Sequence, residues 1–324
     1  MPSERSFRQY YDEELLPTLQ QFEARRQGIV RCFVTTVIVA VVVAGGAGLV
    51  TLAAHTSPAI FAVAAVVGVA AVVLAWFLLT RGFVLDFKHA VIAPIVKFCD
   101  ESLTYSPKTH ISRSVFRASR IFQHSIDRYS GEDHVHGKIG ATAIEFSEVH
   151  AEYKTRHRDS KGRTHTQWHT IFKGLFFIAD FNKHFTGCTV VLPDMAERTF
   201  GWLGKKLQEW NVARSGQLVK LEDPEFEKLF VVYGDDQIEA RYILSPSLMR
   251  RITDFRNKTG KPIALSFVGS NVNLAITTGK NMFEPRLFSP LTDFSMATEY
   301  LADLGLAVGI VEELNLNTRI WTKA

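Results

Sequence analysis

The chain contains one long run of apolar residues, from Cys32 to Thr80, in which 49 consecutive positions hold no Asp, Glu, Lys or Arg. Four residues, His55-Thr56-Ser57-Pro58, divide this run into two blocks. A helix that crosses a bilayer needs roughly 20 apolar residues, and each block reaches that length. The pattern therefore predicts a transmembrane helical hairpin over residues 29–80, with spans at about 29–54 and 58–80.

Basic residues flank the apolar run on both sides, whereas the turn between its blocks has none. The flanking cations are Arg25, Arg26 and Arg31 before the run and Arg81, Lys88 and Lys97 after it. Because Lys and Arg close to span ends are retained in the cytoplasm, we expect both termini to be cytoplasmic. A cleaved signal peptide fits less well, since the first 28 residues carry five acidic side chains and the run is too long.

The segments on either side of the run have helical periodicity. Apolar residues recur every three or four positions from Phe7 to Phe22 and again from Phe83 to Phe98. We therefore expect a cytoplasmic amphipathic helix over residues 1–28 and a juxtamembrane helix over 81–104, which together form a stalk. Pro17 and Pro94 lie at similar distances from the run and should each bend a helix.

Small residues recur at four-residue spacing inside both blocks. They are Ala40, Ala44 and Gly48 in the first block, and Ala64, Gly68, Ala71 and Ala75 in the second. Such stripes allow helix backbones to approach closely in a membrane. The stripes predict either a homo-oligomer or packing of the two spans against each other.

Residues 105–324 change to patterns that are typical of an α+β domain with mainly antiparallel sheet and packed helices. The segments 133–139, 142–157, 163–181 and 189–192 have the character of strands in a meander, and Ser130–Asp133 has the composition of a turn. Further hairpins are expected over 226–233 with 237–244 and over 263–268 with 272–277. Helices are expected over 196–210, from Ser245 to about Lys258, and from Phe294 to about Leu314.

Composition and motifs narrow the function only by exclusion. The formal net charge of +4 is too small to indicate a dedicated nucleic-acid binder, so nucleic acid is an unlikely partner. Three widely spaced cysteines, Cys32, Cys99 and Cys188, indicate neither a disulfide framework nor a metal cage. The sequence lacks the common nucleotide-binding, zinc-protease and serine-hydrolase motifs, and the identity of any cofactor stays unknown.

The long hairpin Glu145–Lys173 carries the best candidate site. A four-residue turn over Asp159–Gly162 would place Glu152 opposite His169, Lys154 opposite Gln167 and Arg156 opposite His165, with His150 further along the same face. A carboxylate between two imidazoles could bind a divalent metal or transfer protons near neutral pH. A solvated outer face with mixed charges is the alternative explanation.

The tip of this hairpin is rich in basic residues. Its cations are Lys154, Arg156, Arg158, Lys161 and Arg163, with Trp168 nearby. They could meet anionic lipid headgroups, track phosphates of RNA, or simply keep an exposed tip soluble. A second cluster, Gly234-Asp235-Asp236 with Glu239, could hold a cation or could be ordinary turn chemistry.

Several stretches resemble a bacterial family of membrane-anchored proteins, Domain of Unknown Function 3137. The stretches are 129–133, 137–140, 172–176, 232–242 and 310–321, which read YSGED, GKIG, FKGLF, VYGDDQIEARY and IVEELNLNTRIW. The order of leader, apolar hairpin and soluble region is also similar. The resemblance implies a protein of the bacterial inner membrane with two spans, and it implies no activity and no catalytic residues.

Two classes of function remain open at this stage. The first is a non-catalytic binding or scaffolding module, with a cytoplasmic α+β domain held at the membrane to bind a protein partner or the lipid surface. The second is a metal-dependent hydrolase that uses the His150, Glu152 and His169 face. The missing motifs favour the first class.

Overall fold

The computed structural model describes residues 4–54, 57–158, 163–181, 183–194, 216–314 and 316. The chain divides into two compact units. The first, called the hairpin unit below, comprises Pro2–Ile95 with Phe283–Leu301, and the second, the sheet unit, comprises Val96–Met282 with Ala302–Ala324. The expected helix over 196–210, the expected turn over 159–162 and Lys161 lie outside the described residues.

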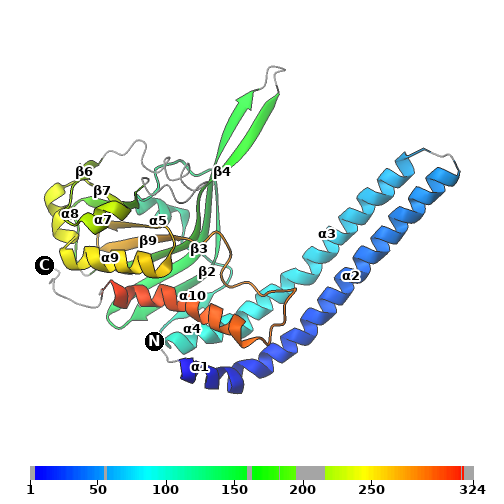
Figure 1. The fold of residues 1–324 in the computed structure, drawn as a ribbon, viewed down its shortest axis with the longest axis horizontal. Helices are drawn as coiled ribbons and strands as arrows, with labels where there is room; N and C mark the ends of the chain where they lie inside the picture. Colours follow the sequence, from blue (N-terminus) through cyan, green and yellow to red (C-terminus); the bar gives the residue numbers. More distant parts are fainter. Residues whose placement is uncertain are drawn as a thin grey trace. The chain divides into compact units, whose positions relative to one another are not determined.

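Two long helices, α2 (Leu16–Ala53) and α3 (Ala59–Phe87), lie antiparallel in the hairpin unit (Figure 1). The continuous helical stretches that contain them have apolar windows with mean hydropathies of 2.4 and 2.7, so both are long and apolar enough to cross a membrane. A third helix, α10 (Phe294–Glu313), also meets these criteria, but half of its most apolar window is buried inside the protein. The two predicted apolar helices are thus confirmed.

Small side chains lie where α2 and α3 approach each other. A Cβ atom added at Gly68 would lie 3.3 Å from the Cβ of Ala40, and one added at Gly48 would lie 3.3 Å from the Phe61 ring. These positions of the two stripes therefore serve packing within the hairpin. Oligomerisation through the stripes stays a prediction.

Both flanks of the apolar run are helical, but the downstream helix ends at Cys99 rather than at residue 104, because Thr104 begins strand β1 (Thr104–Ser106). Helix α1 (Glu4–Tyr10) leads through a π turn (Tyr11–Leu15) into α2, and α3 leads through a second π turn (Lys88–Ile92) into α4 (Ala93–Cys99). Each π turn ends two residues before a proline, Pro17 or Pro94. Because proline has no N–H to donate, the hydrogen-bonding pattern of the helix must change next to it, and here it changes in the same way in both flanks.

The residues that the structure describes contain a nine-stranded antiparallel sheet in the order β1-β2-β3-β4-β9-β8-β5-β7-β6 (Figure 1). This confirms the predicted α+β class. The strands are β1 (Thr104–Ser106), β2 (Arg128–Ile139), β3 (Thr142–Arg158), β4 (Thr164–Asp180), β5 (Cys188–Pro193), β6 (Gln217–Val219), β7 (Phe230–Gly234), β8 (Ile263–Val268) and β9 (Asn271–Thr277). Shorter helices α5 (Arg113–Ala118), α7 (Pro224–Leu229), α8 (Gln237–Ile243) and α9 (Pro246–Thr259) also belong to the sheet unit.

The predicted four-strand meander is wrong at its last step. Strand β5 pairs with β7 and β8 rather than with β4, because the β8–β9 hairpin lies between β4 and β5 in the sheet. The β8–β9 hairpin itself was predicted correctly, with a turn at Gly269, which has a φ of 63°. Such a left-handed conformation favours glycine.

The predicted hairpin over 226–233 with 237–244 is also wrong. Residues 226–229 belong to helix α7, so that only 230–233 lie in a strand, and residues 237–243 form helix α8. The side chain of Asp236 accepts hydrogen bonds from the backbone N–H groups of Ile238 and Glu239 and thus caps the helix. Buried Ala240, Ile243 and Leu244 then follow helical spacing. Alternating polar and apolar residues had suggested a strand here.

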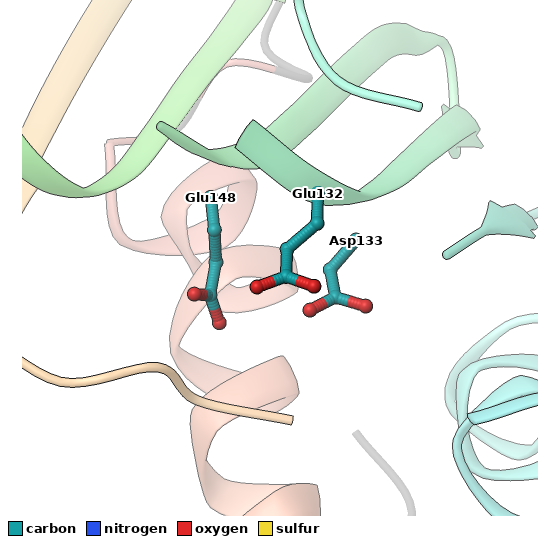
Figure 2. Close-up of side chains that lie close together, drawn as sticks. All are labelled: Glu132, Asp133 and Glu148. Carbon is teal, nitrogen blue, oxygen red and sulfur yellow. The ribbon is translucent and has the colours of Figure 1, made fainter. Parts of the chain in front are cut away.

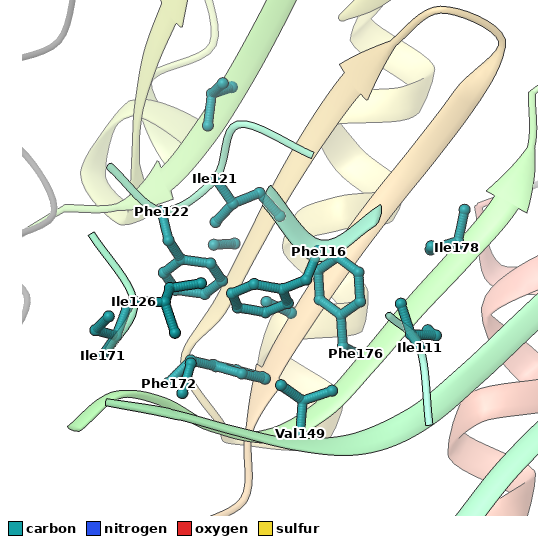
Figure 3. Packing of buried hydrophobic residues seen from close by; sticks show 14 of the residues in the cluster. Ile111, Phe116, Ile121, Phe122, Ile126, Val149, Ile171, Phe172, Phe176 and Ile178 are labelled. Carbon is teal, nitrogen blue, oxygen red and sulfur yellow. The ribbon is translucent and has the colours of Figure 1, made fainter. Parts of the chain in front are cut away.

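One face of the sheet packs against the segment that contains α5. Phe116 and Phe122 stack with ring centroids 4.9 Å apart and contact Phe172 of β4, as Figure 3 shows. Alternate residues of the same strand, such as Leu175 and Phe177, are also fully buried, so both faces of the central sheet are covered. Helix α9 lies over the sheet in Figure 1 and contributes buried residues between Leu248 and Phe255.

Candidate functional site

Strands β3 and β4 extend past the rest of the sheet as a two-stranded ribbon (Figure 1). Strand β2 pairs with β3 no further than Glu152, and β9 pairs with β4 no further than Gly174. Within the described residues, the strand segments Tyr153–Arg158 and Thr164–His169 therefore pair only with each other. These two segments are called the ribbon below.

A β-bulge at the base of the ribbon changes its register. Ala151 lies opposite Phe172, but the next residue, Glu152, lies opposite Thr170, so Ile171 is the extra residue. The predicted pairing of Glu152 with His169 is therefore wrong, and Arg156 lies opposite Thr166 rather than His165. Because side chains alternate along a strand, a shift of one residue moves a side chain to the other face.

The bulge separates the three residues of the predicted metal or acid–base site. His150 and Glu152 remain close, with 3.7 Å between Nε2 and Oε1. His169 instead faces Tyr153, with ring centroids 4.8 Å apart, and its Nε2 lies 2.8 Å from the Thr155 hydroxyl. The structure thus brings together two of these residues and places the third on the opposite face.

Each face of the ribbon has its own chemistry. One face carries Lys154, Arg156 and Arg158 with Trp168 opposite Lys154, and it is called the basic face below. The other carries Tyr153 with the histidines, and His157 lies directly opposite His165 near the tip. Arg163 precedes β4 and is exposed. Residues 153–158 and 163–169 contain no acidic side chain.

Two cations flank Trp168 on the basic face. The Arg128 guanidinium lies 3.9 Å from its ring centroid and the Lys154 ammonium 5.9 Å, and 38% of the tryptophan is exposed. Glu152 accepts a hydrogen bond from Arg128 at 3.2 Å, and Asp127 lies 3.7 Å from Lys154. Acidic groups at the base thus orient cations around an accessible indole.

Three carboxylates converge between β2 and β3, in a cluster that the sequence did not indicate. One oxygen from each of Glu132, Asp133 and Glu148 lies within 4.8 Å of the others, and Figure 2 shows the carboxyl groups side by side. Ser130–Asp133 was expected to be a turn, but it belongs to β2, where the register shifts after Glu132. Asp133 adopts a φ of 59°, a conformation that Asp tolerates better than most residues.

Internal donors already contact these carboxylates. Tyr105 donates its hydroxyl to Asp133, Asn281 donates to Glu132 at 3.1 Å, and the backbone N–H of Met282 donates to Glu148 at 2.6 Å. A cleft of about 420 Å³ adjoins Glu132 and Glu148 and is also lined by His150, Lys173 and Lys280. Oxygen ligands of this kind suit Mg²⁺ or Ca²⁺, while the present contacts join β1 and residues 281–282 to the sheet.

Asp235 and Asp236 of the Gly234-Asp235-Asp236 cluster accept hydrogen bonds from other residues of the chain. Asp235 accepts hydrogen bonds from Arg120 at 2.7 Å and from the Cys188 N–H at 3.1 Å, and the hydrogen bond to Asp235 raises the pKa of Arg120. Glu239 accepts hydrogen bonds from the backbone of residues 186 and 187. With Asp236 capping α8, these acids serve turn and capping roles.

Comparison with known families identifies the C-terminal part of the chain. Residues 170–316 match the model of the family described as Protein of unknown function (DUF3137). These residues belong to the DUF3137 family. The resemblance seen in the sequence is thereby confirmed for the DUF3137 region, which runs from β4 to the end of α10. The match begins at Thr170 of β4, directly after the ribbon, so the ribbon, the rest of β3 and the two long helices lie outside it.

Comparisons with individual proteins add little. No curated protein matches the chain. Among solved structures, the crystal structure of the mycobacterial trehalose monomycolate transport factor A, TtfA, is similar over 69% of this chain and 93% of that chain, with 9% identity and a TM-score of 0.33. A similarity this weak has no bearing on the function of the DUF3137 region.

Proposed function

We propose that the protein is a membrane-anchored, non-catalytic module whose ribbon binds an acidic surface of a protein partner. In this proposal residues 29–80 cross the bacterial inner membrane twice, residues 1–28 and 81–104 form the stalk, and residues 105–324 form a cytoplasmic domain. The apolar helices α2 and α3 and the basic residues on both sides of them support this topology.

The basic face of the ribbon is the observation that carries the binding role. It presents an exposed Trp168 beside Lys154, Arg156 and Arg158, on strands that extend beyond the body of the sheet. Trp and Arg are enriched among the residues that dominate the energy of protein interfaces. A cluster of one sign of charge also speeds the approach of an oppositely charged partner.

Two other partners fit this face less well. The described ribbon has no apolar side chain at its tip, where Arg156, Arg158 and Thr164 lie, so it lacks a group that would insert among lipid acyl chains. The net charge of the whole chain is only +4, which argues against binding to nucleic acid. An acidic protein surface would complement the positive charge of the basic face and could also bury the exposed Trp168 indole.

The alternative of a metal-dependent hydrolase loses the geometry on which it was based. It required His150, Glu152 and His169 on one face, and His169 lies on the other. The carboxylate cluster supplies oxygen ligands, but its oxygens accept hydrogen bonds from the protein itself. A non-catalytic role therefore agrees best with the arrangement of these side chains.

The test compares two charge reversals of equal size in the full-length protein. The first variant, Arg156→Glu with Arg158→Glu, changes the basic face. The control, Lys228→Glu with Arg250→Glu, changes two exposed cations elsewhere in the sheet unit. Each protein is crosslinked in cells and purified in mild detergent, and its partners are quantified by mass spectrometry and then tested as purified proteins.

The proposal predicts a partner that the wild type and the control retain and that the ribbon variant loses. Its binding as a purified protein should weaken as salt rises, because exposed charges are screened. The same proteins are tested against anionic liposomes and single-stranded RNA. Selective loss of either of these ligands, without loss of a protein, would overturn the proposal, as would equal partner profiles for the two variants.

A further inference from the structure

The loop before α10 reaches the apolar part of the hairpin unit. The segment Phe283–Leu301 belongs to the same compact unit as the two long helices. At its start, Glu284 pairs with the buried Lys88 of the stalk at 2.9 Å. Four residues later, the Phe288 ring stacks on Trp76 with centroids 5.6 Å apart and planes within 4°. The loop therefore runs along α3 from the stalk toward the spans.

Trp76 marks the depth at which Phe288 lies. The uncharged run ends at Thr80, and Arg81 is the first charged residue after it. Five residues of helix separate Trp76 from Arg81, which corresponds to roughly 7.5 Å along the axis. The Phe33 ring also contacts Trp76, with ring centroids 4.8 Å apart, and Phe33 follows Arg31 by two residues. Phe33 and Trp76 thus lie within the uncharged run, close to Arg31 and Arg81 at its two ends, and the Phe288 ring lies beside Trp76. This is the level of the membrane–water interface, where Trp is enriched in membrane proteins.

Phe288 exposes a large apolar surface. Its side chain is 68% exposed although one face of the ring covers Trp76. On the hairpin itself, the neighbouring Phe77 and Leu78 are 54% and 66% exposed, as expected for residues that face lipid. Phe288 is therefore as exposed as the spans beside it and belongs to the same apolar surface.

Two backbone groups of this loop form hydrogen bonds with side chains of α2. The Leu287 carbonyl accepts a hydrogen bond from Arg26 at 2.8 Å, and the Leu291 N–H donates to Glu23 at 2.9 Å. Irregular backbone close to hydrocarbon is tolerated only where such groups find partners in the protein. The loop meets that requirement at the two positions on either side of its exposed ring.

We propose that Leu287–Phe288 is an interfacial anchor that inserts among lipid acyl chains beside the two spans. This inference rests on the proposed membrane crossing of α2 and α3. The anchor ties a segment from the C-terminal part of the chain to the bilayer, so that the domain is joined to the membrane through the stalk and through this loop. The occupant of the exposed Phe288 surface is lipid.

The test measures lipid contact at single labelled positions in the full-length protein, reconstituted in phosphatidylcholine and phosphatidylglycerol liposomes. Cys32, Cys99 and Cys188 are replaced, and an environment-sensitive fluorophore is attached to a cysteine at position 288, 73 or 238. Val73 is an exposed residue of α3, and Ile238 is a 79% exposed apolar residue of the sheet unit. Quenching by spin-labelled lipids then reports contact with acyl chains.

The proposal predicts blue-shifted emission and strong lipid quenching at position 288, close to the values at 73, and neither effect at 238. A water-exposed label at 288 with lipid contact at 73 would overturn the anchor alone. Water exposure at 73 would instead overturn the membrane crossing on which it depends. If removal of the cysteines prevents folding, the nitrile stretching frequency of p-cyanophenylalanine at position 288 of the otherwise unchanged chain reports whether this side chain is in water or in an apolar environment.

Discussion

The contact between Glu23 and the Leu287–Leu291 loop gives a direct test of how the hairpin unit is held together. The Glu23 carboxylate accepts hydrogen bonds from Arg26 at 2.6 and 2.9 Å and from the Leu291 N–H at 2.9 Å. Its side chain is 15% exposed and that of Arg26 is 11% exposed. Replacement by alanine leaves the Leu291 N–H and the Arg26 guanidinium without this acceptor.

The size of the effect follows from these bonds. A hydrogen bond to a charged group contributes about 1.5–3 kcal/mol, and a buried donor left without a partner costs a similar amount. We therefore expect Glu23→Ala to lower the free energy of local opening of the loop by about 3 kcal/mol. Because 1.4 kcal/mol corresponds to a tenfold change, amide exchange near Leu291 should become about 100-fold faster.

Hydrogen exchange of the full-length protein in detergent, read on peptides that cover residues 286–293, measures this opening. Glu13→Ala is the matched control, because the Glu13 carboxylate is exposed on the preceding π turn and accepts a hydrogen bond from the Gln9 side-chain amide. The control should leave exchange at the loop unchanged. Unchanged exchange in Glu23→Ala, or equal acceleration in both variants, would refute the reasoning.

Three further predictions concern pH, packing and capping. Hydrogen bonds from Arg26 hold the pKa of Glu23 at about 2, below its ordinary value of 4.5. The stabilisation from ionised Glu23 is therefore complete above pH 4.5 and is lost as the pH falls toward 2. The protection factor near Leu291 should fall in this window, and it should fall less in Glu23→Gln. Gly174→Ala should lower the melting temperature strongly, since its Cβ would lie 2.1 Å from the Ile276 carbonyl oxygen, whereas Gly82→Ala, with nothing within 4 Å, should not. Asp236→Ala should cost about 1 kcal/mol in chemical denaturation, because the cap of α8 is lost, and Asp236→Asn should restore most of it.

The sequence predicted those elements whose signals are local. The uncharged run, the two helical flanks and the capping Ser245-Pro246 pair each act within a few residues, and all appear in the structure. The β8–β9 hairpin follows in the same way from alternating residues around Gly269. In each case the local preference and the tertiary fold agree.

The errors arise where a local pattern fits two structures or where one residue changes the register. Ile238, Ala240 and Tyr242 alternate as in a strand, but the same segment satisfies a helix once Asp236 caps it. The bulge at Ile171 moves His169 to the other face from Glu152, and alternation alone cannot reveal an extra residue. Alternation therefore predicted His169 on the same face as Glu152, whereas the structure has it on the other face.

Contacts between distant parts of the chain had no signal in the sequence. Glu132 and Glu148 lie directly opposite each other across β2 and β3, although like charges facing each other usually destabilise a sheet. Likewise, no local pattern links Glu23 to Leu291 or Trp76 to Phe288. These pairs depend on how the whole chain folds back on itself.

The central claim is that two helices cross the membrane and leave the ribbon on the cytoplasmic side. Labelling of single cysteines at Ser57, in the turn between the helices, and at Thr166, in the ribbon, with a maleimide that does not cross the inner membrane tests it most directly. The account predicts labelling at position 57 in intact cells and labelling at 166 only after the inner membrane is made permeable. Labelling at 166 in intact cells, or protection at 57, would contradict it.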